Sequence, residues 1–597
     1  MPSRTFLYTY IRYTIPPYII LLYLKGFRQL QCAPSKVRVR LQDGWVCGII
    51  GTAENRTVFA SFLGVPYAKQ PVGDRRFREL EPHETWDGCY DASTEGPICP
   101  QHDILYKSLL ETSNMDEACI YANIHVPLYA LPEYNTLRST RQLRPPYETG
   151  LNEKEQSGPG LPIFVFIHGG GFAFGSGGIG LHGPEYLIKR DIIVITFNYR
   201  LNVFGFLSLN STSIPGNNGL RDIVTLLKWV QTNAKSFGGD PDNVTLGGQS
   251  AGASLAHLLS MSLAAEGLFK RVILMSGIGT RSYFTTSPAY AKFVADLFLS
   301  SVGINATDPE DIHQQLIAMP IEKIMEVNKQ IQEKFGIVAF LPVVETPVPG
   351  FTTILDDDPE TLLSKGFGKN IPLLIGFTNA ECEIFRPIFE KIDILGSLKE
   401  NPLLILSLNL MYKLPPKVAV DAAQKVESRY FDEEPTMDKY IQSCSDTYYV
   451  YPAIKLTGKR ALMEGAPVFL YQFSYEADFS VIKESKGLQF KGAGHIEDQT
   501  FILRANALEG IKGFSPRTRK DQYMVDQMTT FVKNFICCNN PTCDGGYGQI
   551  WPAANKHLPV KYQNIETPGL FSFKTQTKKQ QEMVQFFDRL YNGTTSS

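Results

Sequence analysis

The chain has 597 residues, of which 43% are hydrophobic, enough for a large buried core. Its 58 basic and 60 acidic residues leave a formal charge of −2 at pH 7, without a basic stripe or an acidic tail, so the charge pattern does not indicate a nucleic-acid partner. Length alone suggests about four domains, but large α/β enzymes often exceed that size as one unit.

The N-terminus has the features of a secretory signal. Arg4 and Arg12 precede an apolar run at 15–24, which is too short to span a bilayer. We therefore divide the chain into a signal peptide, 1–33, and one catalytic domain, 34–597, and expect a secreted protein without stable membrane insertion. A membrane-anchoring segment and a wrongly assigned start are the alternatives.

The rest of the chain alternates strands and helices. Continuous apolar runs indicate strands buried on both faces of a parallel sheet, and apolar residues at helical spacing between Leu220 and Phe237 indicate a helix. This alternation predicts the α/β class, with a large, mostly parallel sheet covered by helices on both sides. We expect strands at 37–41, 57–63, 162–167, 191–197, 243–246, 371–376 and 468–473, helices at 220–237, 253–259 and around 524–535, and a polar surface loop at 130–160.

A candidate nucleophile lies between one of these strands and the next helix. Ser250 is the centre of Gly248-Gln249-Ser250-Ala251-Gly252, a Gly-x-Ser-x-Gly sequence that follows the strand at 243–246 and precedes the helix at 253–259. In that context the serine sits on a sharp turn that exposes its hydroxyl at the helix N-terminus, and the flanking glycines leave room for the turn. An ordinary connecting turn is the alternative.

A serine nucleophile needs a base, and in doubly wound hydrolases the base comes last in the chain. Of the 9 histidines, only His313, His495 and His557 lie beyond Ser250 and its helix. His313 is in a polar sequence that predicts an exposed helix, and His557 follows Asn-Lys in a surface turn. His495 lies in a glycine-flanked loop after the strand at 468–473, so we predict that it is the base.

The acid that orients the base should follow a strand between the serine and the histidine. Glu381, after the strand at 371–376, fits this position, with Glu383 as a close alternative and the acidic run 356–358 as a more distant one. The oxyanion of the intermediate needs backbone N–H donors. Gly170 and Gly171, in the run His168-Gly-Gly-Gly-Phe172, and Ala251 would supply them.

Other features have simpler interpretations. Residues 175–180 match the dinucleotide pattern Gly-x-Gly-x-x-Gly, but they begin well after their strand and the next strand ends without a carboxylate, so we exclude nucleotide binding. No Cys-x-x-Cys pair is present, and we expect neither a cofactor nor a metal. Glycosylation sequons of a secreted chain occur at Asn55, Asn210, Asn305 and Asn592, and a fifth, at Asn243, abuts the nucleophile strand.

The chain has ten cysteines, and nine remain if Cys32 leaves with the signal, so at least one thiol is unpaired within the chain. Cys99 and Cys119 are our first disulfide, closing a polar loop, and Cys47 with Cys89 is a weaker pairing. The pairing of Cys537, Cys538 and Cys543 stays open.

Together these residues resemble the type-B carboxylesterase/cholinesterase family over nearly the whole mature chain. The resemblance is carried by 62–68, 198–201, 237–241 and the serine turn. It implies an α/β-hydrolase fold and a Ser-Glu-His triad at Ser250, Glu381 and His495, because 376–381 matches the family's acid loop. It also implies the disulfide Cys99–Cys119 and a buried ion pair between Arg76 and Glu117. The family usually has glycine after the acid, where this chain has Cys382.

Within the family, the closest similarity is to insect juvenile hormone esterases, carried by 248–252, 267–271, 273–277 and 492–498. Asp222-Ile223 departs from the Asp-Gln of that branch. Cholinesterases place a tryptophan between the cysteines that correspond to Cys99 and Cys119, and here there is none. Neuroligin-like adhesion proteins lack a complete triad.

We therefore expect a secreted serine esterase that cleaves apolar carboxylic esters through an acyl-enzyme. Juvenile hormone, pheromone or odorant esters and xenobiotic esters are the candidate substrates, and the protein would be a monomer or a dimer. The alternative is a catalytically weak, esterase-like binding or adhesion protein.

Overall fold

This computed structural model describes residues 36–595 apart from 54–55, 104–113, 133–159, 281–282, 337, 348–350, 432–433, 510–516, 544, 546–547 and 558. The predicted signal peptide, most of the predicted loop at 130–160 and the sequon at Asn55 lie outside these residues. Within the described part of the chain, no helix is both long enough and apolar enough to cross a membrane.

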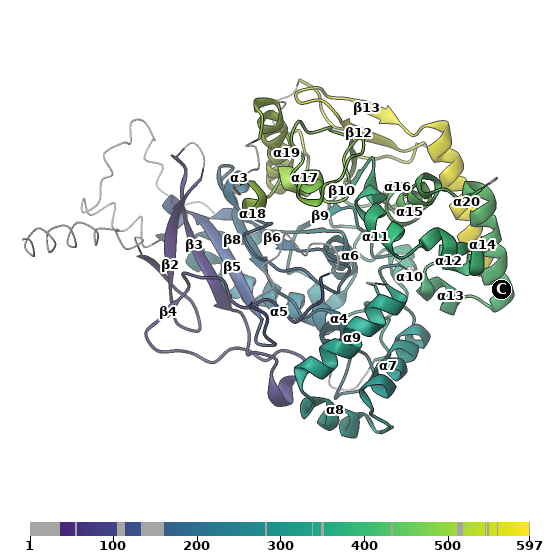
Figure 1. Ribbon diagram of the computed structural model, residues 1–597. Coiled ribbons are helices and arrows are strands. Elements are labelled where there is room, and N and C mark those ends of the chain that lie inside the picture. Colours follow the sequence, from purple (N-terminus) through teal and green to yellow (C-terminus); the bar gives the residue numbers. More distant parts are fainter. Residues whose placement is uncertain are drawn as a thin grey trace, which may run out of the picture.

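One large sheet organises the described residues (Figure 1). Every strand predicted from the apolar runs is present, with its ends shifted in most cases. The thirteen strands are β1 Lys36–Arg40, β2 Trp45–Thr52, β3 Val58–Pro66, β4 Cys89–Asp91, β5 Tyr121–Pro127, β6 Leu161–Ile167, β7 Ile193–Phe197, β8 Gly239–Gln249, β9 Arg271–Met275, β10 Leu373–Thr378, β11 Val468–Phe473, β12 Lys561–Ile565 and β13 Phe573–Thr575.

The strand order is β1-β2-β3-β5-β7-β6-β8-β9-β10-β11-β12-β13, with β4 paired to β2. The centre from β7 to β12 is parallel, and the pairs at both edges of the sheet are antiparallel except β2 with β4. The prediction of a mostly parallel sheet is confirmed. Because parallel strands share a direction, β8, β10 and β11 all end at the same edge of the sheet, where open α/β sheets bind ligands.

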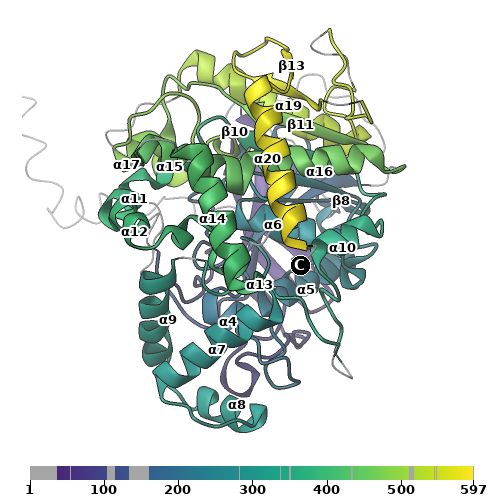
Figure 2. The same cartoon turned by 90° about the vertical axis from the view of Figure 1, so that its right-hand side faces the viewer.

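Helices cover both faces of the sheet (Figures 1 and 2). They are α3 Glu185–Ile188, α4 Asn202–Phe206, α5 Asn218–Asn233, α6 Ala251–Leu259, α7 Pro288–Val302, α8 Pro309–Ile317, α9 Ile321–Phe335, α10 Pro359–Ser364, α11 Arg386–Lys391, α12 Ile394–Glu400, α13 Leu408–Lys413, α14 Pro416–Tyr430, α15 Met437–Ser445, α16 Tyr451–Leu462, α17 Val481–Lys486, α18 Asn506–Glu509, α19 Arg519–Cys538 and α20 Lys578–Thr595. Figure 2 shows α20 lying across the molecule beside α14 and α16.

Alternate side chains of the central strands enter two hydrophobic cores. On β6, Phe164 and Phe166 pack with residues of α3 and α19, whereas Ile163, Val165 and Ile167 pack with residues of α5 and α6 on the other face. This alternation follows from the two-residue period of a strand, and burial on both faces explains why β6 is a continuous apolar run.

The predicted environment of His313 is wrong. His313 does lie on a helix, α8, but its side chain is fully buried rather than exposed. Its Nε2 lies 2.7 Å from the backbone oxygen of Arg76 and its Nδ1 lies 3.3 Å from the guanidinium of Arg78. The polar sequence around His313 misled the prediction because a buried histidine with partners looks the same in sequence as an exposed one.

Candidate active site

Ser250 is the residue between β8 and α6. Its backbone has φ 55° and ψ −124°, a conformation that L residues rarely adopt. The turn requires the two flanking glycines: a Cβ at Gly248 would lie 2.4 Å from the backbone of Gly252, and a Cβ at Gly252 would lie 2.2 Å from the oxygen of Ile167. The Ser250 N–H donates to the oxygen of Met275 on β9 at 2.8 Å, which fixes the turn to the next strand.

Glu381 and His495 meet at the same edge of the sheet. Nδ1 of His495 lies 2.6 Å from Oε2 of Glu381, and the two residues are 1% and 0% exposed. The other carboxylate oxygen accepts the Ser276 hydroxyl and the Thr378 N–H, both at 2.7 Å. These donors compensate the burial of the carboxylate. Because a carboxylate only accepts, Nδ1 carries a proton, and Nε2 is the nitrogen whose lone pair can act as the base.

The alternative carboxylates, Glu383 and the acidic run 356–358, are not paired with His495. Glu383 pairs with Arg386 at 2.8 Å, and Asp357 pairs with Lys365 at 2.7 Å. Local strand patterns left Glu383 as a close alternative to Glu381, because both follow β10, and the resemblance to the family favoured Glu381. Packing of the loop decides, since the N–H of His495 donates to the backbone oxygen of Glu381.

Nε2 of His495 has a partner that the sequence analysis missed. It lies 3.0 Å from the side-chain amide nitrogen of Gln249, the residue before Ser250. Within the described structure no hydrogen bond joins this nitrogen to the Ser250 hydroxyl. The base is therefore bonded to the residue before the serine rather than to the serine hydroxyl.

Cys382, the departure from the family pattern, forms a disulfide with Cys444. Its N–H also donates to the hydroxyl of Ser445 at 3.1 Å. Directly after Ser445 comes the π-helix Asp446–Val450, and the ring of Tyr449 in this helix lies 4.6 Å from the imidazole of His495. The disulfide thus ties the acid loop to the segment that packs against the base. Sequence spacing gave no signal for this pairing.

The glycine loop after β6 turns sharply beside Ser250. Gly170 and Gly171 have φ angles of 110° and 61°, and a Cβ at Gly170 would lie 2.0 Å from the oxygen of Phe174. A Cβ at Gly169 would lie 3.1 Å from the Cβ of Ser250. The loop therefore approaches the serine turn as closely as a backbone without side chains allows.

A buried carboxylate, Asp498, lies three residues after His495. It accepts the Tyr471 hydroxyl at 2.8 Å, and burial raises the pKa of its carboxyl to about 6. Among the residues that the structure describes, no group of three His, Cys, Asp or Glu side chains is placed to hold a metal ion.

Four disulfides are present in the described residues: Cys47–Cys89, Cys99–Cys119, Cys382–Cys444 and Cys538–Cys543. Cys537 is a free, exposed thiol. Arg76 and Glu117 form a two-pronged ion pair, in which Nε donates at 2.7 Å. Asn210 and Asn305 are exposed, Asn243 accepts from Arg271 at 2.5 Å, and Asn592 lies in α20.

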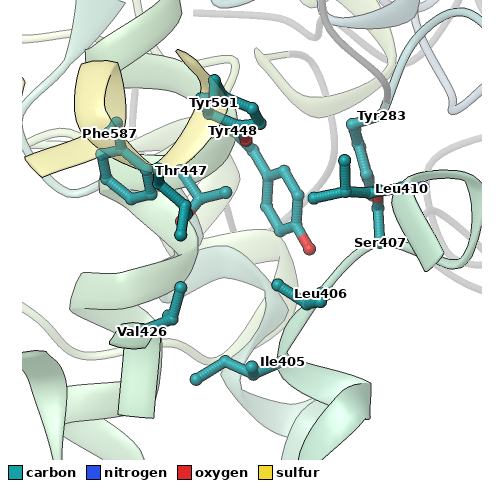
Figure 3. Close-up of a pocket in the computed structure, with 11 residues that line it drawn as sticks. Tyr283, Ile405, Leu406, Ser407, Leu410, Val426, Thr447, Tyr448, Phe587 and Tyr591 are labelled. Atoms are coloured by element: carbon teal, nitrogen blue, oxygen red, sulfur yellow. The ribbon is translucent and has the colours of Figure 1, made fainter. Parts of the chain in front are cut away.

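An apolar cavity is lined in part by the π-helix (Figure 3). Tyr448 belongs to its wall, and its ring centroid lies 4.1 Å from that of Tyr283. Tyr448 is the direct neighbour of Tyr449, which contacts His495, so the cavity and the base share one short helix. The other lining residues are Ile405, Leu406, Ser407, Leu410, Val426, Thr447, Phe587, Leu590 and Tyr591.

Comparisons with known proteins identify the family of the chain. Residues 35–587 match the model of the carboxylesterase family. The chain is 50% identical over 553 residues to juvenile hormone esterase of Heliothis virescens, covering 92% of this chain and 94% of the relative. It is 28% identical to juvenile hormone esterase of Tribolium castaneum, over 88% and 87% of the two chains.

Solved structures give the same result. A crystal structure of juvenile hormone esterase from Manduca sexta, with OTFP covalently attached, superposes with a TM-score of 0.86 at 50% identity and covers 94% of this chain and 100% of the other. A PNB esterase structure superposes with a TM-score of 0.68 at 26% identity, over 92% and 99%. The chain therefore belongs to the carboxylesterase family, as a juvenile hormone esterase-like serine ester hydrolase with the α/β-hydrolase fold.

Proposed function

We propose that the chain hydrolyses carboxylic esters through Ser250, with His495 as the base and Glu381 as the acid that orients it. His495 takes the proton of the Ser250 hydroxyl at Nε2 as the oxygen attacks the ester carbonyl. His495 then gives the proton to the departing alcohol, which leaves an acyl-enzyme on Ser250. A water molecule, deprotonated by His495, attacks this acyl group and releases the carboxylic acid, and the serine regains its proton. The buried 2.6 Å contact between His495 and Glu381, beside the strained serine turn, is the observation that carries this proposal.

The N–H groups of Gly170, Gly171 and Ala251 would stabilise the oxyanion of each tetrahedral intermediate. The positive φ angles of the two glycines expose their N–H groups at a turn that approaches the serine. Ala251 is the first residue of α6, so its N–H is among those that lack a partner within the helix.

The proposed substrates are apolar esters, with juvenile hormone as the first candidate. Aromatic rings flank the base: the ring centroid of Phe385 lies 5.6 Å and that of Tyr449 lies 4.6 Å from the imidazole of His495. The two relatives at 50% identity are both described as juvenile hormone esterases. Pheromone or odorant esters and xenobiotic esters are the alternatives. We also propose secretion, because a predicted signal precedes a chain with several disulfides, which persist in oxidising compartments.

Replacing the serine tests the mechanism. We expect Ser250→Ala to lower kcat for p-nitrophenyl acetate on the order of 10⁶-fold, with an unchanged thermal unfolding temperature. Ser260→Ala is the matched control, since its buried hydroxyl donates to the backbone oxygen of His257 outside the site. Full activity of Ser250→Ala would refute the assignment of the nucleophile.

A substrate panel tests the choice of ester. The wild-type protein is assayed with juvenile hormone, a long-chain acetate pheromone ester and 1-naphthyl acetate. The proposal expects the highest kcat/KM for juvenile hormone. A higher kcat/KM for either acetate would reassign the substrate while leaving the triad intact.

A further inference from the structure

The contact between Gln249 and His495 occupies the atom that the proposed mechanism needs. The side chain of Gln249 is 1% exposed, and its amide nitrogen lies 3.0 Å from Nε2 of His495. Because Glu381 accepts from Nδ1, Nε2 is an acceptor, so the Gln249 amide donates to it. The same lone pair must accept the proton of Ser250. Gln249 and Ser250 therefore compete for one atom.

Gln249 also lines a cavity together with Ile496, the residue that follows the base. The space open to the centres of water molecules in this cavity is about 30 Å³, room for one or two waters or for a displaced amide group. Gly169, in the same wall, contacts the Gln249 amide so closely that a Cβ there would lie 2.5 Å from its oxygen. A side chain at 169 would take the space that the amide uses.

The cavity wall contains an acceptor without a partner. Nδ1 of His168 lies 2.8 Å from the oxygen of Gly169 and carries the proton, which leaves Nε2 with a lone pair. This Nε2 is buried, and within the described structure it has no hydrogen-bond partner. Nδ1 of His182, in the same wall, is also buried without a hydrogen-bond partner among the described residues. Burial lowers the pKa of these histidines to about 4 and about 3, so both are neutral at pH 7.

We propose that Gln249 is a positioning residue that exchanges hydrogen-bond partners during catalysis. In the free enzyme its amide donates to His495. When a substrate closes the bond between Ser250 and His495, the amide turns into the cavity and donates to Nε2 of His168. The free enzyme thereby keeps its base occupied until an ester is bound. This inference rests on the proposed role of Ser250 and His495.

The rate at which Ser250 is phosphorylated tests the competition. Diisopropyl fluorophosphate reacts by forming a bond between Ser250 Oγ and phosphorus as the P–F bond breaks, with the serine proton passing to His495 and fluoride leaving. Gln249→Met keeps the shape of the side chain but cannot donate. The variant lacks the bond to His495 in the free enzyme and also the bond to His168 in the reacting state, so the two losses offset and we expect no rise in the second-order rate constant. Loss of the first bond alone would raise the rate constant by about 2- to 12-fold.

Gln499→Met is the matched control, because Gln499 lines the same cavity and, among the described residues, the partner of His495 Nε2 is Gln249 and not Gln499. We expect its rate constant to equal that of the wild type. A rate constant about 2- to 12-fold higher for a folded Gln249→Met protein would overturn the exchange, because it would mean that the amide leaves His495 without gaining another partner.

Crystal structures of the wild-type protein, free and after reaction with the same reagent, provide a second test that needs no variant. We expect the Gln249 amide within hydrogen-bond distance of His495 in the free protein and of His168 in the adduct. An adduct with the amide still on His495 would overturn the exchange alone. Failure of the reagent to label Ser250 would instead refute the proposed function.

Discussion

The disulfide Cys382–Cys444, which adjoins Glu381, should both stabilise the fold and hold the catalytic groups in place, and its removal tests both effects. Cys382 and Cys444 are 62 residues apart and both are buried, so both are replaced by alanine to leave no free thiol. In the chain-entropy model, a cross-link over that separation stabilises the fold by about 4 kcal/mol. We expect Cys382→Ala/Cys444→Ala to lose up to this amount of unfolding free energy.

The disulfide Cys538–Cys543 supplies the control, because its cysteines are only 5 residues apart. The same model gives it about 2 kcal/mol. Urea unfolding, followed by tryptophan fluorescence, should therefore show a loss that is about 2 kcal/mol larger for the 382/444 variant than for the 538/543 variant.

Activity distinguishes the two variants further. Cys382 adjoins Glu381, and Cys444 leads into the π-helix whose Tyr449 contacts His495, so loss of the tether loosens both partners of the base. Small misplacements of catalytic groups cost up to about 10²-fold in rate, and we expect kcat to fall by about 10- to 100-fold. The 538/543 variant should keep its kcat. Equal unfolding free energies or equal kcat values in the two variants would refute this reasoning.

Three further changes test other parts of the structure. Asp222→Asn should cost about 3–5 kcal/mol of unfolding free energy, because it leaves Arg200 buried without the carboxylate that it contacts at 2.6 and 2.9 Å; a loss below about 1 kcal/mol in urea unfolding would contradict this. Gly170→Ala should lower kcat for 1-naphthyl acetate by about 10²- to 10³-fold, since it forces the loop that would hold the oxyanion to move, and a normal kcat would argue against that loop. Acid should destabilise the fold. Burial lowers the pKa of four histidines to about 3 or 4, so on acidification the unfolded chain binds protons at these histidines before the folded protein does. The stability that is present above about pH 6.5 is therefore lost as the pH falls toward 4. This loss is opposed by Asp498, whose pKa is raised to about 6, and by four more carboxyls whose pKa burial raises, Glu185, Glu345, Asp446 and Glu497. The net loss is therefore smaller than the roughly 5 kcal/mol per pH unit that the four histidines alone would give, and equal urea midpoints at pH 7 and pH 5 would refute it. The histidines are His125, His168, His182 and His257.

Local patterns in the sequence were enough to place the main elements of the fold. The continuous apolar run of β6 and the helical spacing of α5 have periods that follow from backbone geometry and are visible within a few residues. The turn at Ser250 was equally readable, because its strain requires glycine at fixed positions on both sides.

What the sequence by itself determined is therefore the α/β alternation, the sharp turn at Ser250 and a short set of candidate bases and acids. The resemblance to the family also pointed to Glu381, whose contact with His495 is seen only in the tertiary structure. The tertiary structure alone showed that Cys382 pairs with Cys444 and that Gln249 reaches the base 246 residues away. The physical reason is that strand and helix periods are local properties of the backbone. Contacts between distant side chains depend instead on how the sheet orders its strands and how the loops beyond its edge pack together.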